Sequence, residues 1–382
     1  MKQSPDSIGW LARFDAVTRL LAVLKDPTSV RGLDAASWDI LVRQARHANL
    51  LGRLYKLLEK SGELEGVPER PRNHLLSGSR MADRQHLSIK YETSLLRETL
   101  NARGIPVILL KGAAYVLASL PSASGRVFAD IDILVPHAQL NDAESALMLA
   151  GWVSTSQDAY DQRYYRQWMH ELPAMEHMFR GTTLDVHHTI LPPTSRLKPD
   201  PVLLVKDSSE IPDMPGVYTL SPCDMVLHSA AHLFHEGEPD NLLRDLSDLD
   251  ILLRHFGVKT GFWNELAIRA KRLQLEEPLR LAVRYTRHFL DTPFADDVLK
   301  TLRVETNGNL RQRFLDTIYL RVLRPQHQTC YDRFSSLARK LLYVRSHWLR
   351  MPPHLLAYHL AHKALFPPKV ESVPLTDDVQ AL

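Results

Sequence analysis

The sequence has little cysteine and no long apolar run. Among its 382 residues only Cys223 and Cys330 are cysteines, and they are far apart without a CxxC pair. This excludes a disulfide framework and a zinc site made of thiolates. The N-terminal "MKQSPDSIGW" lacks the apolar segment of a signal peptide, and no stretch approaches 18 uninterrupted apolar residues. We therefore expect a cytoplasmic protein without a membrane span.

The sequence also lacks a strong charge of one sign. It has 47 Lys and Arg against 44 Asp and Glu, a formal net charge of +3 at pH 7. This balance does not by itself indicate nucleic-acid binding, and it disfavours a long nucleic acid as the substrate. The hydrophobic fraction of 45% and the charged fraction of 24% are ordinary for a globular protein. The length leaves room for two or three domains.

Helical spacing of apolar residues dominates both ends of the chain. It predicts helix over 37–60, where Ser37 is the expected N-cap, and over 74–104. Helical spacing returns at "SPCDMVLHSAAHLFH", where Ser221 stands at a cap position and Pro222 at the first helical position.

The middle of the chain has short, β-branched apolar runs instead. They predict strands at 105–110 and 131–136, and a hairpin over 174–190 that turns at Arg180 and Gly181. We predict an α+β fold with a mixed β-sheet core. The expected regions are an N-terminal helical region at 1–103, the α/β core at 104–215 and a C-terminal helical domain at 216–382.

Two carboxylates interrupt the apolar run "FADIDILV". Side chains alternate along a strand, so Asp130 and Asp132 would point to the same face. Buried carboxylates this close repel unless they are protonated, paired or bound to a cation, and their oxygens suit Mg²⁺. Asp185, in the predicted strand "TTLDVHH", would add a third carboxylate for a two-metal phosphoryl or nucleotidyl displacement. The alternative is a strand-end Asp185 paired with a nearby Arg or His.

The order strand, glycine turn, short helix, Asp-x-Asp strand and later lone Asp is the pattern of polymerase β-type nucleotidyltransferases. More narrowly, the chain resembles the bacterial uncharacterised nucleotidyltransferase family of that superfamily. The resemblance implies a nucleotidyltransferase-type mixed sheet and Mg²⁺, or Mn²⁺, as cofactor. The segments that carry it are "ILLKGAAY" (108–115), "GRVFADIDILV" (125–135), "AGW" (150–152), "LDVHH" (184–188) and "HSAAHLFH…NLLRDLSDLDILL" (228–253).

The resemblance also implies roles for single residues. Asp130, Asp132 and Asp185 would bind the metal and carry catalysis, and the backbone of Gly112 would approach the triphosphate of an NTP. The serine that usually follows this glycine is replaced by Ala113, so one hydroxyl contact to a phosphate is missing.

Three further residues near these motifs are candidates for nucleotide binding. Lys111 could contact a phosphate as a point charge, or be a solvated lysine at a strand end. Arg126 could bind phosphate with two nitrogens or pair with an aspartate. His187 shares a strand face with Asp185 and could orient a carboxylate or act as a base, or make a plain hydrogen bond.

His228, His232 and His235 share one face of a predicted helix. One hypothesis is that this helix covers the nucleotide cleft, with His232, Arg244 and Asp248 contacting base, ribose or acceptor. A second is a metal site of a phosphohydrolase, although "HSAAH" lacks the glutamate of HExxH. A third is that Asp and Arg of the neighbouring helix satisfy these histidines.

We therefore predict a Mg²⁺-dependent nucleotidyltransferase that moves an NMP from an NTP to an unidentified acceptor and releases pyrophosphate. A small molecule or a protein is favoured as the acceptor. The alternative from another class is a non-catalytic nucleotide- or partner-binding module with the same fold, which Ala113 supports. Asp130, Asp132 and Asp185 argue against it, because clustered carboxylates cost stability and a binding module has no use for them.

Overall fold

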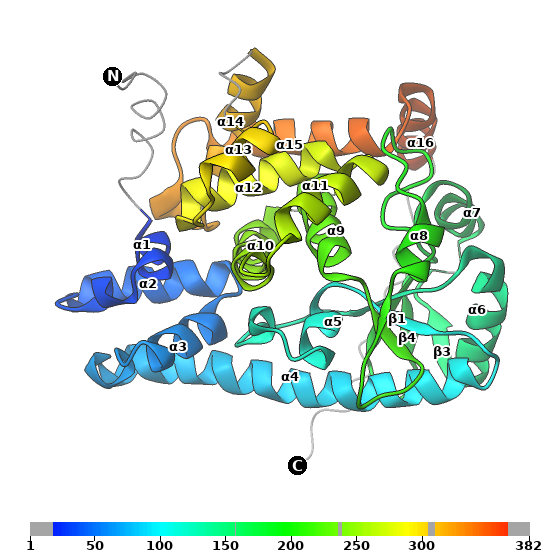
Figure 1. Cartoon of the computed structure of the whole chain (residues 1–382), viewed down its shortest axis with the longest axis horizontal. Helices are drawn as coiled ribbons and strands as arrows, with labels where there is room; N and C mark the ends of the chain where they lie inside the picture. The colour runs from blue at the N-terminus through cyan, green and yellow to red at the C-terminus, as the bar shows by residue number, and fades with distance from the viewer. Residues whose placement is uncertain (1–17, 157, 236–238, 305–309, 366–382) are drawn as a thin grey trace.

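The computed structural model describes residues 18–156, 158–235, 239–304 and 310–365 (Figure 1). Its helices are α1 (Arg19–Lys25), α2 (Ala35–His47), α3 (Leu51–Lys60), α4 (Glu69–Asn101), α5 (Lys111–Leu117), α6 (Leu140–Leu149), α7 (Ala159–Trp168), α8 (Pro201–Lys206), α9 (Pro222–His235), α10 (Leu242–Gly257), α11 (Phe262–Arg272), α12 (Glu276–Leu290), α13 (Asp296–Thr301), α14 (Leu310–Val322), α15 (Ser335–Arg350) and α16 (Pro353–Leu365). Its strands are β1 (Val107–Leu109), β2 (Ile131–Leu134), β3 (Trp152–Ser154), β4 (Met175–His177), β5 (Thr183–His187), β6 (Ser209–Glu210) and β7 (Val217–Thr219).

The strands form one mixed sheet in the order β3-β4-β5-β2-β1-β7-β6. The pairs β2–β5 and β1–β7 are parallel, and the other pairs are antiparallel. The predicted α+β class is therefore confirmed. The strand predictions at 105–110 and 131–136 correspond to β1 and β2. The predicted hairpin is β4 and β5, and its turn contains Gly181 at φ +63°. Strand β7 extends the sheet beyond residue 215.

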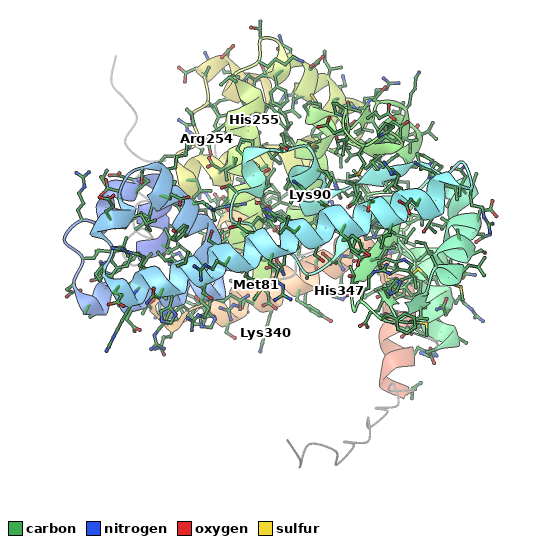
Figure 2. All side chains as sticks on the ribbon, turned by 90° about the horizontal axis from the view of Figure 1, so that it is seen from below. Met81, Lys90, Arg254, His255, Lys340 and His347 are labelled. Carbon is green, nitrogen blue, oxygen red and sulfur yellow. The ribbon has the colours of Figure 1, made fainter. Side chains whose placement is uncertain are left out.

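Helix α4 supports one side of the molecule. Its buried positions include Leu75, Ala82, Ile89 and Leu96, whose spacing places them on one helical face. That face contacts α3, α5, α6 and β1. Figure 1 shows α4 running below the other elements, and Figure 2 shows it from the outside, where Met81 is 54% exposed.

The helices after the sheet form a second packed layer. Helices α9, α10 and α12 contact one another, and α15 contacts α9. The aromatic rings of Phe234 (α9), Tyr285 (α12) and Tyr319 (α14) pack together, with centroids 5.1–5.9 Å apart. Helix α9 also contacts α5, so it joins this layer to the sheet. Within the described residues, no helix is both apolar and long enough to span a lipid bilayer.

The predicted helical segment 37–60 is not one continuous helix, because a turn separates α2 from α3. Asn49 adopts φ +55°, a left-handed conformation that ends a helix, and Leu50 N–H then bonds to Ala45 O at 2.8 Å. Ser37 is not the N-cap. The Asp34 carboxylate takes that role and accepts a hydrogen bond from Ser37 N–H at 2.8 Å. The predicted cap of α9 is confirmed, since Asp224 N–H bonds to Ser221 Oγ at 3.2 Å.

Helices α3 and α4 approach closely at a pair of glycines. A Cβ atom on Gly52 would lie 2.6 Å from the carbonyl oxygen of Gly125 and 2.8 Å from that of Gly78. Only a residue without a side chain fits there. The contact brings α3 against the loop that follows residue 121. It therefore places Arg53 of α3 near Arg126, where both arginines contact Asp248.

Candidate active site

The junction between β1 and α5 places Lys111 over β2. Leu110 N–H bonds to the Asp132 carbonyl oxygen at 3.0 Å, which holds the end of β1 against β2. Lys111 follows with φ +44°, an unusual conformation for a residue with a side chain. From there its Nζ donates a hydrogen bond to Asp132 Oδ1 at 2.9 Å. Lys111 is thus directed toward the Asp-x-Asp motif.

The register of the sheet sets Asp132 beside Asp185. The two residues are direct partners in the parallel pair β2–β5, so their side chains lie on the same face. Asp130 precedes β2, which begins at Ile131. Asp130 and Asp132 nevertheless line one cavity, as their predicted common face requires. The fold therefore brings the three predicted carboxylates into one region.

The three carboxyl groups have different electrostatic surroundings. Burial favours protonation of Asp132, but Lys111 and His187 outweigh it and hold the pKa of Asp132 below its usual range. Burial, and next the charge of Asp132, raises the pKa of Asp130. The same two causes raise the pKa of Asp185 to about 8. One buried carboxylate is thus ionised beside two carboxyl groups that resist ionisation.

This arrangement fits a divalent cation. The charge of Lys111 does not offset the effect of burial on the pKa of Asp130 and Asp185, so a further cation would favour the ionised form of both carboxyl groups. Asp132, Asp185 and His187 each offer a ligand atom within 4.8 Å of the others. Asp130 lies outside this compact group but near enough for the charge of Asp132 to act on it. A bound cation would offset the repulsion among the carboxylates.

A cavity of about 150 Å³ opens beside Asp130 and Asp132. This volume is smaller than that of most small-molecule sites, so the cavity can hold only part of a nucleotide. It combines the two carboxylates with the cationic Lys111, Arg126 and Arg244, a mixture suited to phosphate groups and a metal ion. Its lining residues are Lys111, Gly112, Arg126, Phe128, Ala129, Asp130, Asp132, His232, Leu233, Asn241, Leu242, Arg244 and Asp245.

Arg126 lines the cavity, and its guanidinium group is bound by the buried carboxylate of Asp248. Its Nε donates to Asp248 Oδ2 at 2.6 Å, and its guanidinium lies 4.8 Å from the centre of the Phe128 ring. Arg53 approaches the other oxygen, Asp248 Oδ1, at 2.7 Å and donates to the carbonyl of Ser122. Asp248 is 1% exposed and does not line the cavity. The interpretation that Arg126 pairs with an aspartate therefore holds, and Asp248 orients it.

Gly112 is required where it stands. A Cβ at this position would collide with the Phe128 ring and the Arg126 guanidinium. The backbone of α5 can therefore approach the cavity only because residue 112 has no side chain. This packing explains the glycine whether or not a phosphate binds beside it.

The histidines of α9 do not act as one cluster. His232 lines the cavity, with its Nε2 3.8 Å from Asp245 Oδ2. His228 and His235 are buried, each 3% exposed. In the described part of the chain, the compact groups of metal-ligand side chains do not include these histidines. The structure thus gives no support to a phosphohydrolase centre on α9. Arg244 reaches the cavity and bonds to Asp245 at 2.9 Å.

His187 lies between Asp132 and Glu171, a residue that the sequence did not indicate. Its Nε2 donates to Asp132 Oδ1 at 3.0 Å, and its Nδ1 lies 3.4 Å from Glu171 Oε2. Glu171 and Arg53 were not among the predicted site residues, since neither lies in a recognisable motif. The run "MHELPAMEH" places histidine beside glutamate, which is the one local signal that could have indicated Glu171.

Comparison with known proteins identifies the family of this chain. The family model described as "Uncharacterised nucleotidyltransferase" matches residues 34–291, which include α2, the whole sheet and α9 to α12. No curated protein matches the chain. Because the match covers well over half of the sequence, this chain belongs to the uncharacterised nucleotidyltransferase family.

Proposed function

We propose that this protein is a Mg²⁺-dependent nucleotidyltransferase that moves an NMP from an NTP to an acceptor and releases pyrophosphate. The observation that carries the proposal is the pairing in register of Asp132 and Asp185 on β2 and β5. Asp130 lines one cavity together with Asp132. Membership of a nucleotidyltransferase family supports it. In the reaction, an acceptor oxygen or nitrogen would form a bond to the α-phosphorus of the NTP. The bond from that phosphorus to the bridging oxygen of pyrophosphate would break.

In this proposal Asp130, Asp132 and Asp185 hold the metal ion, with His187 orienting Asp132 through its Nε2. When bound there, Mg²⁺ would supply charge neutralisation for the triphosphate and lower the pKa of the acceptor hydroxyl. The carboxylates would position the α-phosphate through the metal ion, because Asp132 and Asp185 share one face of the sheet.

The remaining residues would bind the nucleotide. Lys111 would contact a phosphate as a point charge, and Arg126 could contact phosphate through the guanidinium nitrogens that Asp248 does not occupy. Gly112 lets α5 approach the Phe128 ring and the Arg126 guanidinium, beside which the triphosphate would lie. His232 and Arg244, which also line the cavity, would contact ribose, base or acceptor. Asp248 would not touch the nucleotide but would orient the Arg126 guanidinium that contacts its phosphate. We favour a small molecule or a protein as the acceptor, since the net charge is only +3.

Label transfer tests the proposal. The protein would be incubated with each NTP labelled at the α-phosphate, with Mg²⁺ or Mn²⁺, and with fractions of a bacterial lysate. We expect label on an acceptor with the wild type, and a loss of at least about a hundredfold in Asp132→Asn. Asp39→Asn, on the exposed surface of α2, is the matched control and should transfer label normally.

Transfer by Asp132→Asn at the wild-type rate would contradict the assigned roles. A wild type that binds an NTP and Mn²⁺ but transfers no label would instead favour the non-catalytic module. The replacement of the usual serine by Ala113 gives that alternative its support.

A further inference from the structure

A second set of metal-ligand side chains lies on the far side of His187 from Asp132. Residues 170–172 run antiparallel to β5: Glu171 and His187 form a β-bridge, and Leu172 N–H bonds to Val186 O at 2.9 Å. Residues directly opposite each other in such a pair project to the same face. His170 stands next to Glu171, and its ring centroid lies 5.1 Å from that of His187.

The distances in this set are close to those of a metal centre, with one pair of ligand atoms slightly farther apart. Glu171 Oε2 lies 3.4 Å from His187 Nδ1 and 3.8 Å from His170 Nε2. In a tetrahedral zinc site with metal–ligand bonds of about 2.0–2.2 Å, neighbouring ligand atoms lie roughly 3.3–3.6 Å apart. The three residues offer ligand atoms within 4.8 Å of one another. His170 is 4% exposed and His187 1%, so the ligands are largely held in place by packing.

The hydrogen bond to Asp132 decides which nitrogen of His187 is available. The ionised Asp132 carboxylate only accepts hydrogen bonds, so the Nε2 of His187 carries the proton. In a neutral ring, Nδ1 then holds a lone pair. No described residue donates a hydrogen bond to this buried Nδ1, and it faces the Glu171 carboxylate. The Nδ1 of His187 and the Glu171 Oε2 atom, 3.4 Å apart, are close enough to bind the same cation.

We propose that His170, Glu171 and His187 bind a divalent transition-metal ion of the zinc class, separate from the Mg²⁺ of the proposed reaction. Two imidazoles and one carboxylate are a common zinc donor set, which leaves one position for water. Asp132 would be the carboxylate that orients the metal-bound His187. The ion would tie the segment after α7 to β5 and fix the ring that supports Asp132.

Zinc binding to the purified full chain, stripped with chelator, is the direct test. We expect one equivalent of Zn²⁺ to bind in excess Mg²⁺ and to raise the melting temperature with zinc concentration. His170→Gln and Glu171→Gln should each weaken zinc binding at least about tenfold. The matched controls change exposed residues of the same types, namely Glu176→Gln and His255→Gln. Figure 2 shows His255. They should bind zinc like the wild type.

A second measurement needs no variant, so it remains decisive if a variant fails to fold. X-ray absorption on the zinc-loaded wild type should show two imidazole nitrogens among the nearest ligands. Zinc held by the Asp130, Asp132 and Asp185 carboxylates would give mainly oxygen ligands and would overturn the proposal.

Unchanged zinc affinity in folded His170→Gln and Glu171→Gln would also overturn the proposal. So would a wild type that binds no zinc, in which a protonated His187 bridges the two carboxylates instead. Each of these outcomes leaves the label-transfer test unaffected, because His170 and Glu171 are outside the residues proposed for nucleotidyl transfer.

Discussion

The ammonium group of Lys111 and the carboxylate of Asp132 lie 2.9 Å apart, so the lysine occupies an oxygen that the proposed metal ion would use. Binding of a metal and an NTP would release Lys111 to a phosphate. Lys111→Met should therefore weaken binding of a non-hydrolysable NTP analogue by roughly tenfold or more, about 1.4 kcal/mol. Binding of Mn²⁺ alone should be retained or strengthened, because a competing cation is removed.

Isothermal titration of Mn²⁺ and of the analogue would separate these two effects. Lys90→Met changes an exposed lysine on α4 and serves as the control (Figure 2). Weaker Mn²⁺ binding in Lys111→Met would show that Lys111 supports the carboxylates instead of competing for them.

The buried Asp248 should matter for stability. It balances Arg53 and Arg126, and Asp248→Asn would leave the buried Arg53 without this counter-charge and Arg126 with the more distant Asp245, at 3.8 Å. We expect the free energy of unfolding in urea to fall by about 3–5 kcal/mol. Asp39→Asn breaks an exposed ion pair with Arg43 and should leave the free energy of unfolding nearly unchanged. Equal stability of the two variants would mean that water reaches Asp248.

The crossing of α3 and α4 should not tolerate a side chain on Gly52. The closest atoms to an added Cβ are backbone carbonyls, which cannot rotate away. Gly52→Ala should thus destabilise the fold by about 1–3 kcal/mol, although alanine is the better helix former. Gly66→Ala adds a Cβ into open space and should change the melting temperature little. A Gly52→Ala protein that melts like the wild type would mean that the helices can move apart.

Acid should destabilise the protein partly through His228. Its complete burial holds its pKa well below the ordinary value. Below about pH 6.5 the unfolded chain binds a proton there and the folded chain does not, so stability falls as the pH falls. Comparing urea unfolding at pH 5.5 and 7.5, we expect His228→Gln to remove about 1 kcal/mol of the wild-type loss.

His255→Gln is the control for this comparison, since His255 is exposed to water in the folded chain. If His228→Gln shows the wild-type pH dependence, the loss of unfolding free energy at pH 5.5 comes from other groups. His187 is the first of these to examine, because burial lowers its pKa to about 4.

Sequence by itself determined the local features of this protein. Strands β1 and β2, the hairpin of β4 and β5, and the start of α9 follow from patterns that repeat every two or 3.6 residues. The placement of Asp130 and Asp132 toward one cavity also follows, because alternation within a short segment fixes it. These features depend on a few neighbouring residues, so periodicity suffices to predict them.

Tertiary structure alone decided the contacts between distant segments. The pairing of Asp132 with Asp185 depends on the register between β2 and β5. These strands are neighbours in the sheet but are not consecutive along the chain. Arg53 and Asp248 meet because Gly52 lets α3 approach the loop that carries Arg126. Glu171 faces His187 because the segment after α7 returns along β5. Such contacts arise from packing of the whole chain, which no local periodicity encodes.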